Sequence, residues 1–256
     1  MTATATRPRL ARVRVVEPPG QPLTADAVRS ACNRVKFAGA SEKAQPRFGE
    51  AAGVWALRTG SRTTFMATDG AAMAVVDVDG VLPGSAERSF FPYAVLAGKA
   101  KGRPMPEALA DARPLTDAVL SVLRRVQTEA GASLAFEAAE LDEAVRMVGA
   151  CKTVSVALTV AGDVLTFSGR DAVVTEFEVV AESMYGEGGR IGDVSVSPGL
   201  LLDGAKRLGD EPVWLVQLKG AGGLRMLVLR QGAYAYAVCE RLPEKPAAPL
   251  ADPKTA

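Results

Sequence analysis

The order of its predicted segments constrains this chain most, because strand-like and helix-like runs repeat as β-α-β-β-β. In the second half, period-two runs predict strands and one amphipathic run predicts each helix. The first unit is predicted as Ser133–Glu137, helix Ala139–Gly149, Val154–Val160, Asp163–Ser168 and Ala172–Val180. The second unit is predicted as Val194–Val196, helix Pro198–Leu208 (with Ser197 as N-cap), Val213–Lys219, Leu224–Leu229 and Ala233–Cys239. A unit that occurs twice indicates an α+β fold with internal pseudo-symmetry.

The first half begins in the same way and then departs from the pattern. Its predicted segments are Ala11–Val16, helix Thr24–Phe37, Gly53–Thr59, Thr63–Thr68, Ala72–Val78, Ser89–Phe91 and helix Pro92–Lys101. The segment RPMPEALADARP then follows, which is too rich in proline and too short for three strands. A helix over Thr116–Gln127 closes this half. We expect domains over residues 10–130 and 131–242, with mobile tails at residues 1–9 and 243–256.

Composition favours a binding protein over an enzyme. The 256 residues include no histidine, which removes the commonest general base and most catalytic zinc sites. The three cysteines are scattered, which suits a reducing cytoplasm and buried, inert thiols at Cys32 and Cys151. No apolar run is long enough to cross a bilayer. We expect no cofactor and no catalytic residues.

Charge is distributed unevenly along the chain. Residues 1–130 carry 18 basic and 12 acidic side chains, whereas residues 131–256 carry 12 and 17. Halves of opposite sign would favour head-to-tail association between copies. Chance variation in surface charge explains the same numbers equally well.

Local sequence resembles the β subunit of bacterial DNA polymerase III, the replicative sliding clamp. The segment ATDGAAMAVV (67–76) is similar to the ATDGHRLAV-type hairpin of that family's middle domain. FGEAAGVWALRTGS (48–61), RSFFPYAVLAGKAKG (88–102) and SVLRRV (121–126) are similar to its neighbouring elements, in order. The second half resembles the family's last domain, ending in AYAYAVCERL. The family's first domain is absent, and Ala71-Ala72 replace its His-Arg.

The resemblance implies a DNA-clamp fold, with antiparallel sheets outside and helices inside. It further implies a processivity factor that encircles duplex DNA without sequence specificity, tethers a DNA polymerase and is handled by a clamp loader. Six domains per ring imply a homotrimer of two-domain chains, in the nucleoid region of the cytoplasm. The predicted phosphate contacts lie at helix ends: Arg29, Arg34, Lys36, Lys99, Lys101, Arg103, Arg146, Lys152, Lys206 and Arg207. Ordinary solvated helix charges are the alternative interpretation.

The family also binds short partner peptides in an apolar pocket between its middle and last domains. The resemblance places this pocket at Thr68, Gly70, Met73, Arg125, Val126, Ala237 and Cys239. Plain core packing is the alternative for Met73, Val126 and Ala237. Because Ala237 and Cys239 are small, we expect a pocket that takes a different peptide or has lost the usual one.

Three other interpretations stay open. Asp77 and Asp79, two apart on a strand, could hold a metal, although Asp79-Gly80 is typical of a turn. SMYGEGGRIGD (183–193) lacks the Lys-Ser/Thr of a phosphate loop and is predicted to be a flexible connector. The chain could also be a degenerate clamp homologue, a protein-interaction module in replication or repair that no longer encircles DNA.

Overall fold

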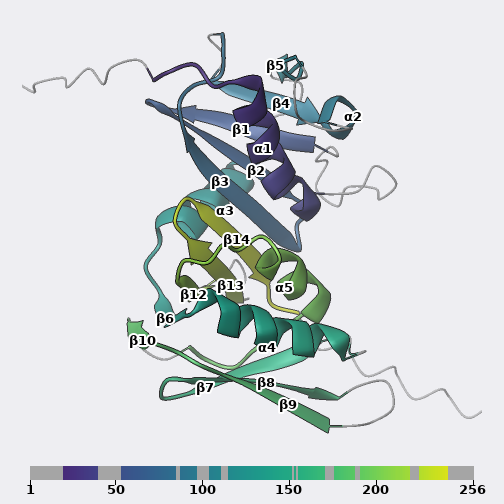
Figure 1. Cartoon of the computed structure of the whole chain (residues 1–256), viewed down its shortest axis with the longest axis vertical. Coiled ribbons are helices and arrows are strands. Elements are labelled where there is room, and N and C mark those ends of the chain that lie inside the picture. Colours follow the sequence, from purple (N-terminus) through teal and green to yellow (C-terminus); the bar gives the residue numbers. More distant parts are fainter. Residues whose placement is uncertain are drawn as a thin grey trace, which may run out of the picture.

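Two antiparallel sheets and five helices make up the part of the chain that the structure describes (Figure 1). The computed structural model describes residues 20–39, 53–84, 87–96, 104–110, 115–151, 153, 155–170, 176–187, 191–219 and 225–241. The helices are α1 (Ala25–Val35), α2 (Tyr93–Leu96), α3 (Asp117–Thr128), α4 (Ala138–Ala150) and α5 (Pro198–Ala205), with a 3₁₀ turn at Lys36–Ala38. The predicted strand at 11–16 and the end of the predicted helix at 92–101 lie outside the described residues.

The larger sheet joins the two halves of the chain. Its strands, in spatial order, are β10 (Tyr185–Glu187), β6 (Ala132–Phe136), β12 (Val213–Lys219), β13 (Arg225–Gln231), β14 (Tyr234–Cys239), β3 (Ala72–Asp79), β2 (Arg62–Thr68), β1 (Gly53–Thr59), β4 (Arg88–Pro92) and β5 (Leu109–Ala110). The halves meet where β14 pairs antiparallel with β3, in a register that sets Ala237 opposite Met73.

The smaller sheet belongs to the second half alone. Its order is β11 (Val194–Val196), β7 (Val156–Ala161), β8 (Val164–Arg170) and β9 (Glu176–Glu182). The same arrangement recurs in the first half as β4-β1-β2-β3, because β4 lies beside β1 as β11 lies beside β7. The predicted β-α-β-β-β order is therefore confirmed, and β9 is the structural counterpart of β3.

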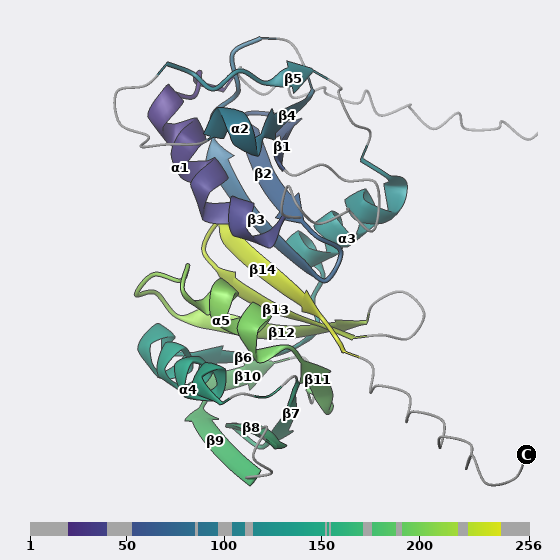
Figure 2. The same cartoon turned by 90° about the vertical axis from the view of Figure 1, so that its right-hand side faces the viewer.

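Alternation along the strands gives the large sheet two apolar faces. On β3, Ala74 and Val76 face one core and Met73 and Val75 face the other. The first core also holds the buried sides of α1, α4 and α5, and the second holds α3. Figure 2 accordingly places α1, α2, α5 and α4 on one side of the molecule and α3 on the opposite side. We call these sides the helix face and the α3 face.

Two details differ from the sequence expectations. The predicted connector at 183–193 contains β10, which extends the large sheet because Gly186 pairs with Leu134 of β6. The predicted helix at 198–208 ends at Ala205, and the Ser197 side chain makes no capping bond although it occupies the N-cap position. By contrast, the Thr24 side chain caps α1, accepting a hydrogen bond from the Ala27 amide at 3.2 Å. Within the described residues no helix could span a membrane.

The first half has no room for the second set of three strands. In the second half, α5 to β14 takes residues 198–239, whereas only residues 93–116 separate β4 from α3. This shorter stretch contains α2 and three prolines, and its described strand is the two-residue β5. The truncation of the first half stays a prediction, which this shorter stretch of chain supports.

Candidate nucleic-acid interface

The C-terminal ends of α1 and α5 meet on the helix face, beside the strands that join the two halves. The Arg34 guanidinium lies 4.8 Å from the ring centre of Tyr234, and that of Arg207 lies 5.1 Å from the ring centre of Phe37. The Phe37 ring in turn packs against Tyr236 at 5.4 Å. We call Arg34, Lys36, Lys206 and Arg207 the junction basic cluster.

The sequence explains why cations gather at this place. A helix carries partial negative charge at its C-terminal end, which favours basic side chains there, and aromatic rings attract cations over their faces. Lys206 and Arg207 are exposed, while Arg34 and Lys36 are half-buried. The four cations come from two halves of the chain, so the fold concentrates positive charge at the boundary between them.

The buried Tyr236 and the half-buried Tyr93 form hydrogen bonds with the helical segments next to the cluster. The Tyr236 hydroxyl donates to the Leu200 carbonyl of α5 at 2.8 Å, and the Tyr93 hydroxyl donates to the Lys36 carbonyl at 2.5 Å. Burial raises the pKa of Tyr93 to about 12, so its hydroxyl stays neutral at physiological pH. A Cβ added to Gly204 would come within 2.0 Å of the Tyr236 ring, so α5 approaches β14 as closely as glycine permits.

The part of the helix face formed by α4 is acidic, unlike the junction. Along α4 the acidic side chains are Glu137, Glu140, Asp142 and Glu143, against the single basic Arg146. Arg146 forms an ion pair with Asp142 at 2.8 Å, and Lys206 pairs with Asp203 at 3.6 Å. A cleft of about 560 Å³ between α4 and α5 has charges of both signs. A phosphate would therefore be attracted to the junction and repelled by α4.

Arg29 has to be removed from the predicted phosphate contacts. Its side chain is only 6% exposed and donates to the carbonyls of Val95 at 3.4 Å and Pro104 at 3.0 Å. The helical pattern placed it on α1 without showing that this side of the helix packs under the segment after β4. Lys99, Lys101, Arg103 and Lys152 lie outside the described residues.

The residues of the predicted peptide pocket gather on the α3 face. Thr68 and Gly70 form the β2–β3 turn, where the Gly70 amide donates to the Thr68 hydroxyl at 3.0 Å. Cys239 lies beside this turn, with its thiol 3.8 Å from the Gly70 carbonyl. Met73, Val126 and Ala237 belong to one apolar cluster and are 5%, 0% and 3% exposed. These three residues are covered in this structure, so only the rim of the predicted pocket is open.

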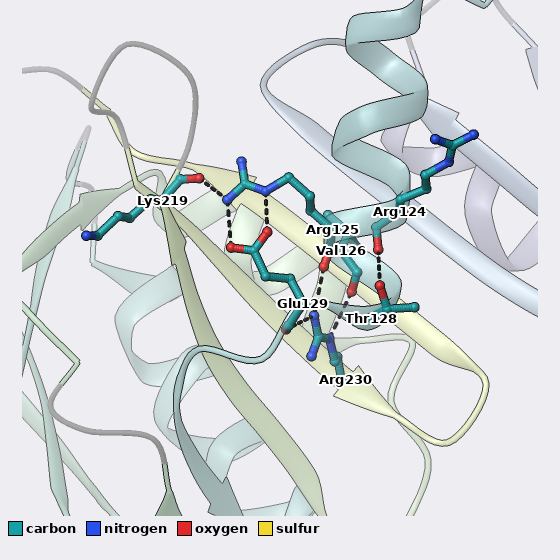
Figure 3. A network of polar contacts seen from close by, with 7 residues as sticks. All are labelled: Arg124, Arg125, Val126, Thr128, Glu129, Lys219 and Arg230. Carbon is teal, nitrogen blue, oxygen red and sulfur yellow. Dashed lines mark hydrogen bonds and ion pairs between the residues drawn. The ribbon is translucent and has the colours of Figure 1, made fainter. Parts of the chain in front are cut away.

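Arg125 is turned away from that cluster (Figure 3). Its guanidinium is bound by the Glu129 carboxylate within α3 and donates to the Lys219 carbonyl at the end of β12. The hydrogen bonds and charge of Arg125 lower the pKa of Glu129. Arg125 thus ties α3 to the second half instead of lining a cavity.

Arg230 of β13 is the residue on which this network depends. Its guanidinium donates to the carbonyls of Val126 at 2.8 Å, Arg125 at 3.0 Å and Glu129 at 2.9 Å (Figure 3). The last carbonyls of a helix lack partners inside the helix, and Arg230 donates to that of Val126, to that of the C-cap Glu129, and to that of Arg125, which also accepts the Glu129 amide at 2.9 Å. An arginine directly after the apolar run MLVL of β13 was the sequence signal for this role.

The fold is shared with a group of solved structures. The β subunit of DNA polymerase III from Pseudomonas aeruginosa superposes with a TM-score of 0.68 and 16% identity, over 89% of this chain and 68% of that one. The Thermotoga maritima subunit gives 0.66 and 15%, over 91% and 70%, and the Streptococcus pneumoniae TIGR4 subunit gives 0.64 and 14%, over 94% and 69%. This chain has the DNA sliding-clamp fold. It spans about two thirds of the length of those clamps, and no protein-family model or curated protein matches it.

Within the clamp fold, neighbouring side chains donate hydrogen bonds to Asp77. It accepts hydrogen bonds from the Thr64 hydroxyl at 2.6 Å and from the Gln127 amide of α3 at 2.9 Å. Asp79 pairs instead with Arg62 at 2.8 Å, and Gly80 adopts a φ of 126° in the turn that follows. Among the described residues no cluster of three metal-binding side chains occurs. The two aspartates therefore hold a helix and a hairpin.

Proposed function

We propose that this chain is a DNA sliding clamp that holds duplex DNA on its helix face without reading the sequence. The observation that carries the proposal is the junction basic cluster, which collects cations from α1 and α5 on the face where four helices lie together. Exposed lysine and arginine contact phosphates without distinguishing bases. A binding role of this kind involves no chemical step, in keeping with a chain that lacks histidine.

The distribution of charge suits a weak, mobile contact. Four cations at the junction attract the phosphate backbone, while the acidic side chains of α4 limit the contact to that part of the helix face. Few phosphate contacts mean modest affinity with a shallow dependence on salt, which allows movement along the duplex. Specific readers of DNA instead place side chains in a groove.

A charge-reversal pair on each face tests the proposal. The double variant K206E/R207E changes two exposed residues of the junction, and R88E/R124E changes two exposed residues on the α3 side by the same net charge. Fluorescence anisotropy with a short duplex at low salt gives the dissociation constant. We expect K206E/R207E to weaken binding about tenfold or more and to reduce the salt slope by roughly two.

The matched variant R88E/R124E should bind within about twofold of the unchanged protein, since its sites lie away from the helix face. Equal loss in both variants would mean that binding follows net charge alone and would contradict the proposal. Absence of duplex binding in the unchanged protein would favour the interaction module that the sequence leaves open.

We further propose that polymerase and clamp loader meet the α3 face at the β2–β3 turn. Gly70 and Cys239 form the open rim there, beside the covered apolar cluster of Met73, Val126 and Ala237. Burial, and then the charge of Asp69, raises the pKa of Cys239, so its thiol is a small neutral contact. C239R should abolish stimulation of the cognate polymerase in primer extension, whereas C239S and both variants should retain their DNA affinity.

A further inference from the structure

The segment that joins α5 to β12 lies next to the junction basic cluster and has charge of the opposite sign. It has the sequence LGDEP (208–212) and directly follows Arg207. Asp210 and Glu211 are exposed, and neither forms an ion pair with any residue that the structure describes. We call residues 209–211 the acidic segment.

A cavity of about 480 Å³ separates the acidic segment from Arg34 of α1. Its lining comes from both halves of the chain: Arg34, residues 209–211 and residues 231–233. The Arg34 guanidinium lies over the Tyr234 ring, and no ion pair within the described part of the chain joins it to Asp210 or Glu211. Opposite charges therefore line one cavity without pairing.

Gln231, the last residue of β13, holds the acidic segment in this place. The residue is only 5% exposed. Its amide oxygen accepts a hydrogen bond from the Gly209 amide at 2.5 Å, and its amide nitrogen donates to the Gly209 carbonyl at 3.0 Å and to the Glu211 carbonyl. Movement of the segment would leave buried polar groups without partners, which is costly.

The same hairpin also positions Arg34. Gln231 pairs with Tyr234 across the β13–β14 hairpin, and the Tyr234 ring carries the Arg34 guanidinium at 4.8 Å from the ring centre. One hairpin thus holds a cation from the first half and the acidic segment of the second half on opposite sides of one cavity.

The fixed carboxylates lower the attraction of the junction for phosphate. Residues that line one cavity of this size lie within roughly one Debye length of each other, about 10 Å at 0.1 M salt, so salt does not screen their charges fully. Lys206 of the cluster is also paired with Asp203 at 3.6 Å. The net positive charge that a phosphate meets is therefore smaller than four cations alone would give.

We propose that the acidic segment limits how tightly the junction basic cluster holds DNA, and that Gln231 is the positioning residue that keeps the segment beside Arg34. This role rests on the proposed function and adds a limit on affinity to it. The acidic side chains of α4 restrict where DNA lies on the helix face, whereas the acidic segment opposes a cation of the cluster itself. A weakened phosphate contact suits movement along the duplex.

Two other roles for the acidic segment fit less well. A metal ion bound by Asp210 and Glu211 would be repelled by Arg34 in the same cavity. An ion-pair latch between the halves would need Arg34 to contact one of the carboxylates, and within the described residues no such contact exists.

Neutralisation of the acidic segment is the first test, with fluorescence anisotropy of the full chain on a short duplex at low salt as the readout. D210N/E211Q should tighten binding about threefold or more, because two unfavourable charges are removed. The gain should shrink as salt is raised. The matched control E178Q/E182Q makes the same change in net charge at exposed residues of β9, and α4 lies between β9 and the junction (Figure 2). It should leave the dissociation constant unchanged.

A double-mutant cycle with Gln231→Met tests the positioning role. Methionine keeps the length of the buried side chain but forms none of its three hydrogen bonds, so the acidic segment is released. Hydrogen exchange at the Gly209 amide should become faster in Gln231→Met and stay slow in D210N/E211Q. In the Gln231→Met background, D210N/E211Q should tighten binding clearly less than in the unchanged protein. A residue that only stabilises the fold would leave this gain the same.

Three results would contradict these roles. If the unchanged protein binds duplex and D210N/E211Q binds no more tightly than E178Q/E182Q, the limit on affinity is wrong while the clamp proposal stands. If the gain from D210N/E211Q is the same with and without Gln231, the positioning role is wrong. If neither the unchanged protein nor D210N/E211Q binds duplex at low salt, both this proposal and the proposed function are wrong.

Discussion

The two halves of this chain are built on one plan, yet they are stabilised in different ways. The second half contains both sets of three strands, and its helices α4 and α5 pack against both sheets. The first half has one set, β1 to β3, with β4 and the two-residue β5 beside it. In place of the second set it has α3, which covers the other side of β2 and β3.

The difference teaches that the first half depends on the second. The carbonyls at the end of α3 are satisfied by Arg230, and Arg125 of α3 reaches the end of β12. Among the described residues, α3 is tied to its own half by the hydrogen bond from Gln127 to Asp77 and by the apolar side chains that pack on β2 and β3. We therefore expect the first half to lose structure before the second, and the following substitutions are ordered by their expected effect on stability.

The largest effect should come from Arg230→Ala. It leaves three half-buried carbonyls of α3 without their charged donor, which costs about 2–4 kcal/mol. Arg230→Lys keeps the charge but lacks the planar fork, so its loss should be intermediate. Chemical denaturation gives the free energy of unfolding, and hydrogen exchange should report early opening of α3. If the free energy of unfolding of Arg230→Ala stays within about 0.5 kcal/mol of that of the unchanged protein, the first half does not depend on the second in this way.

A smaller loss is expected where α5 touches β14. Gly204→Ala places a methyl group within 2.0 Å of the Tyr236 ring, which should cost about 1–3 kcal/mol by overpacking. Gly199→Ala is the matched control in the same helix, since its nearest neighbour would be the Ser197 hydroxyl at 3.9 Å. That control should stabilise the protein by up to about 1 kcal/mol. Opposite shifts in the melting temperatures of the two variants would support the close contact between α5 and β14 in the second half.

The hydrogen bond between Gln127 of α3 and Asp77 of β3, inside the first half, should contribute less to stability. Gln127→Ala removes the amide that donates to Asp77 and should cost about 1 kcal/mol, because Asp77 keeps the Thr64 hydroxyl. If Gln127→Ala proves more damaging than Arg230→Ala in the same denaturation series, then α3 belongs mainly to its own half.

The smallest effect concerns pH. Arg125 lowers the pKa of Glu129, so the pair stabilises the fold above the ordinary carboxyl pKa and loses this contribution as pH falls through the lowered value. The pair is partly exposed, and its contribution should stay below about 1 kcal/mol. Glu129→Gln should reduce the loss in free energy of unfolding as the pH is lowered. An unchanged dependence on pH would show that the pair of Arg125 and Glu129 does not stabilise the fold.

Sequence reasoning reached the repeat and most strands, because alternation and turn residues are local signals. It placed β12 and β11 at their observed bounds. It missed β10, since a short glycine-rich strand is defined by its partner β6 and not by its own pattern. It also set Arg29 among the phosphate contacts, because helical periodicity does not show which neighbouring segment covers a charged side chain.

The candidate site was harder to predict than the fold. Arg34, Lys36, Lys206 and Arg207 are far apart in the sequence, and only the pairing of β14 with β3 brings their helices together. The predicted pocket residues do gather, yet Arg125 points toward Glu129 and Lys219. Rotamers of long side chains follow from the partners available in space, which a single sequence does not reveal.

Retention on circular and linear DNA tests the central claim, that the chain is a clamp, most directly. The assembled protein is incubated with a nicked plasmid and passed through a sizing column at moderate salt, before and after the plasmid is cut once. We predict that protein travels with the circle and is lost from the linear form, because an encircling clamp slides off free ends. Equal retention on both forms, or on neither, would contradict encirclement.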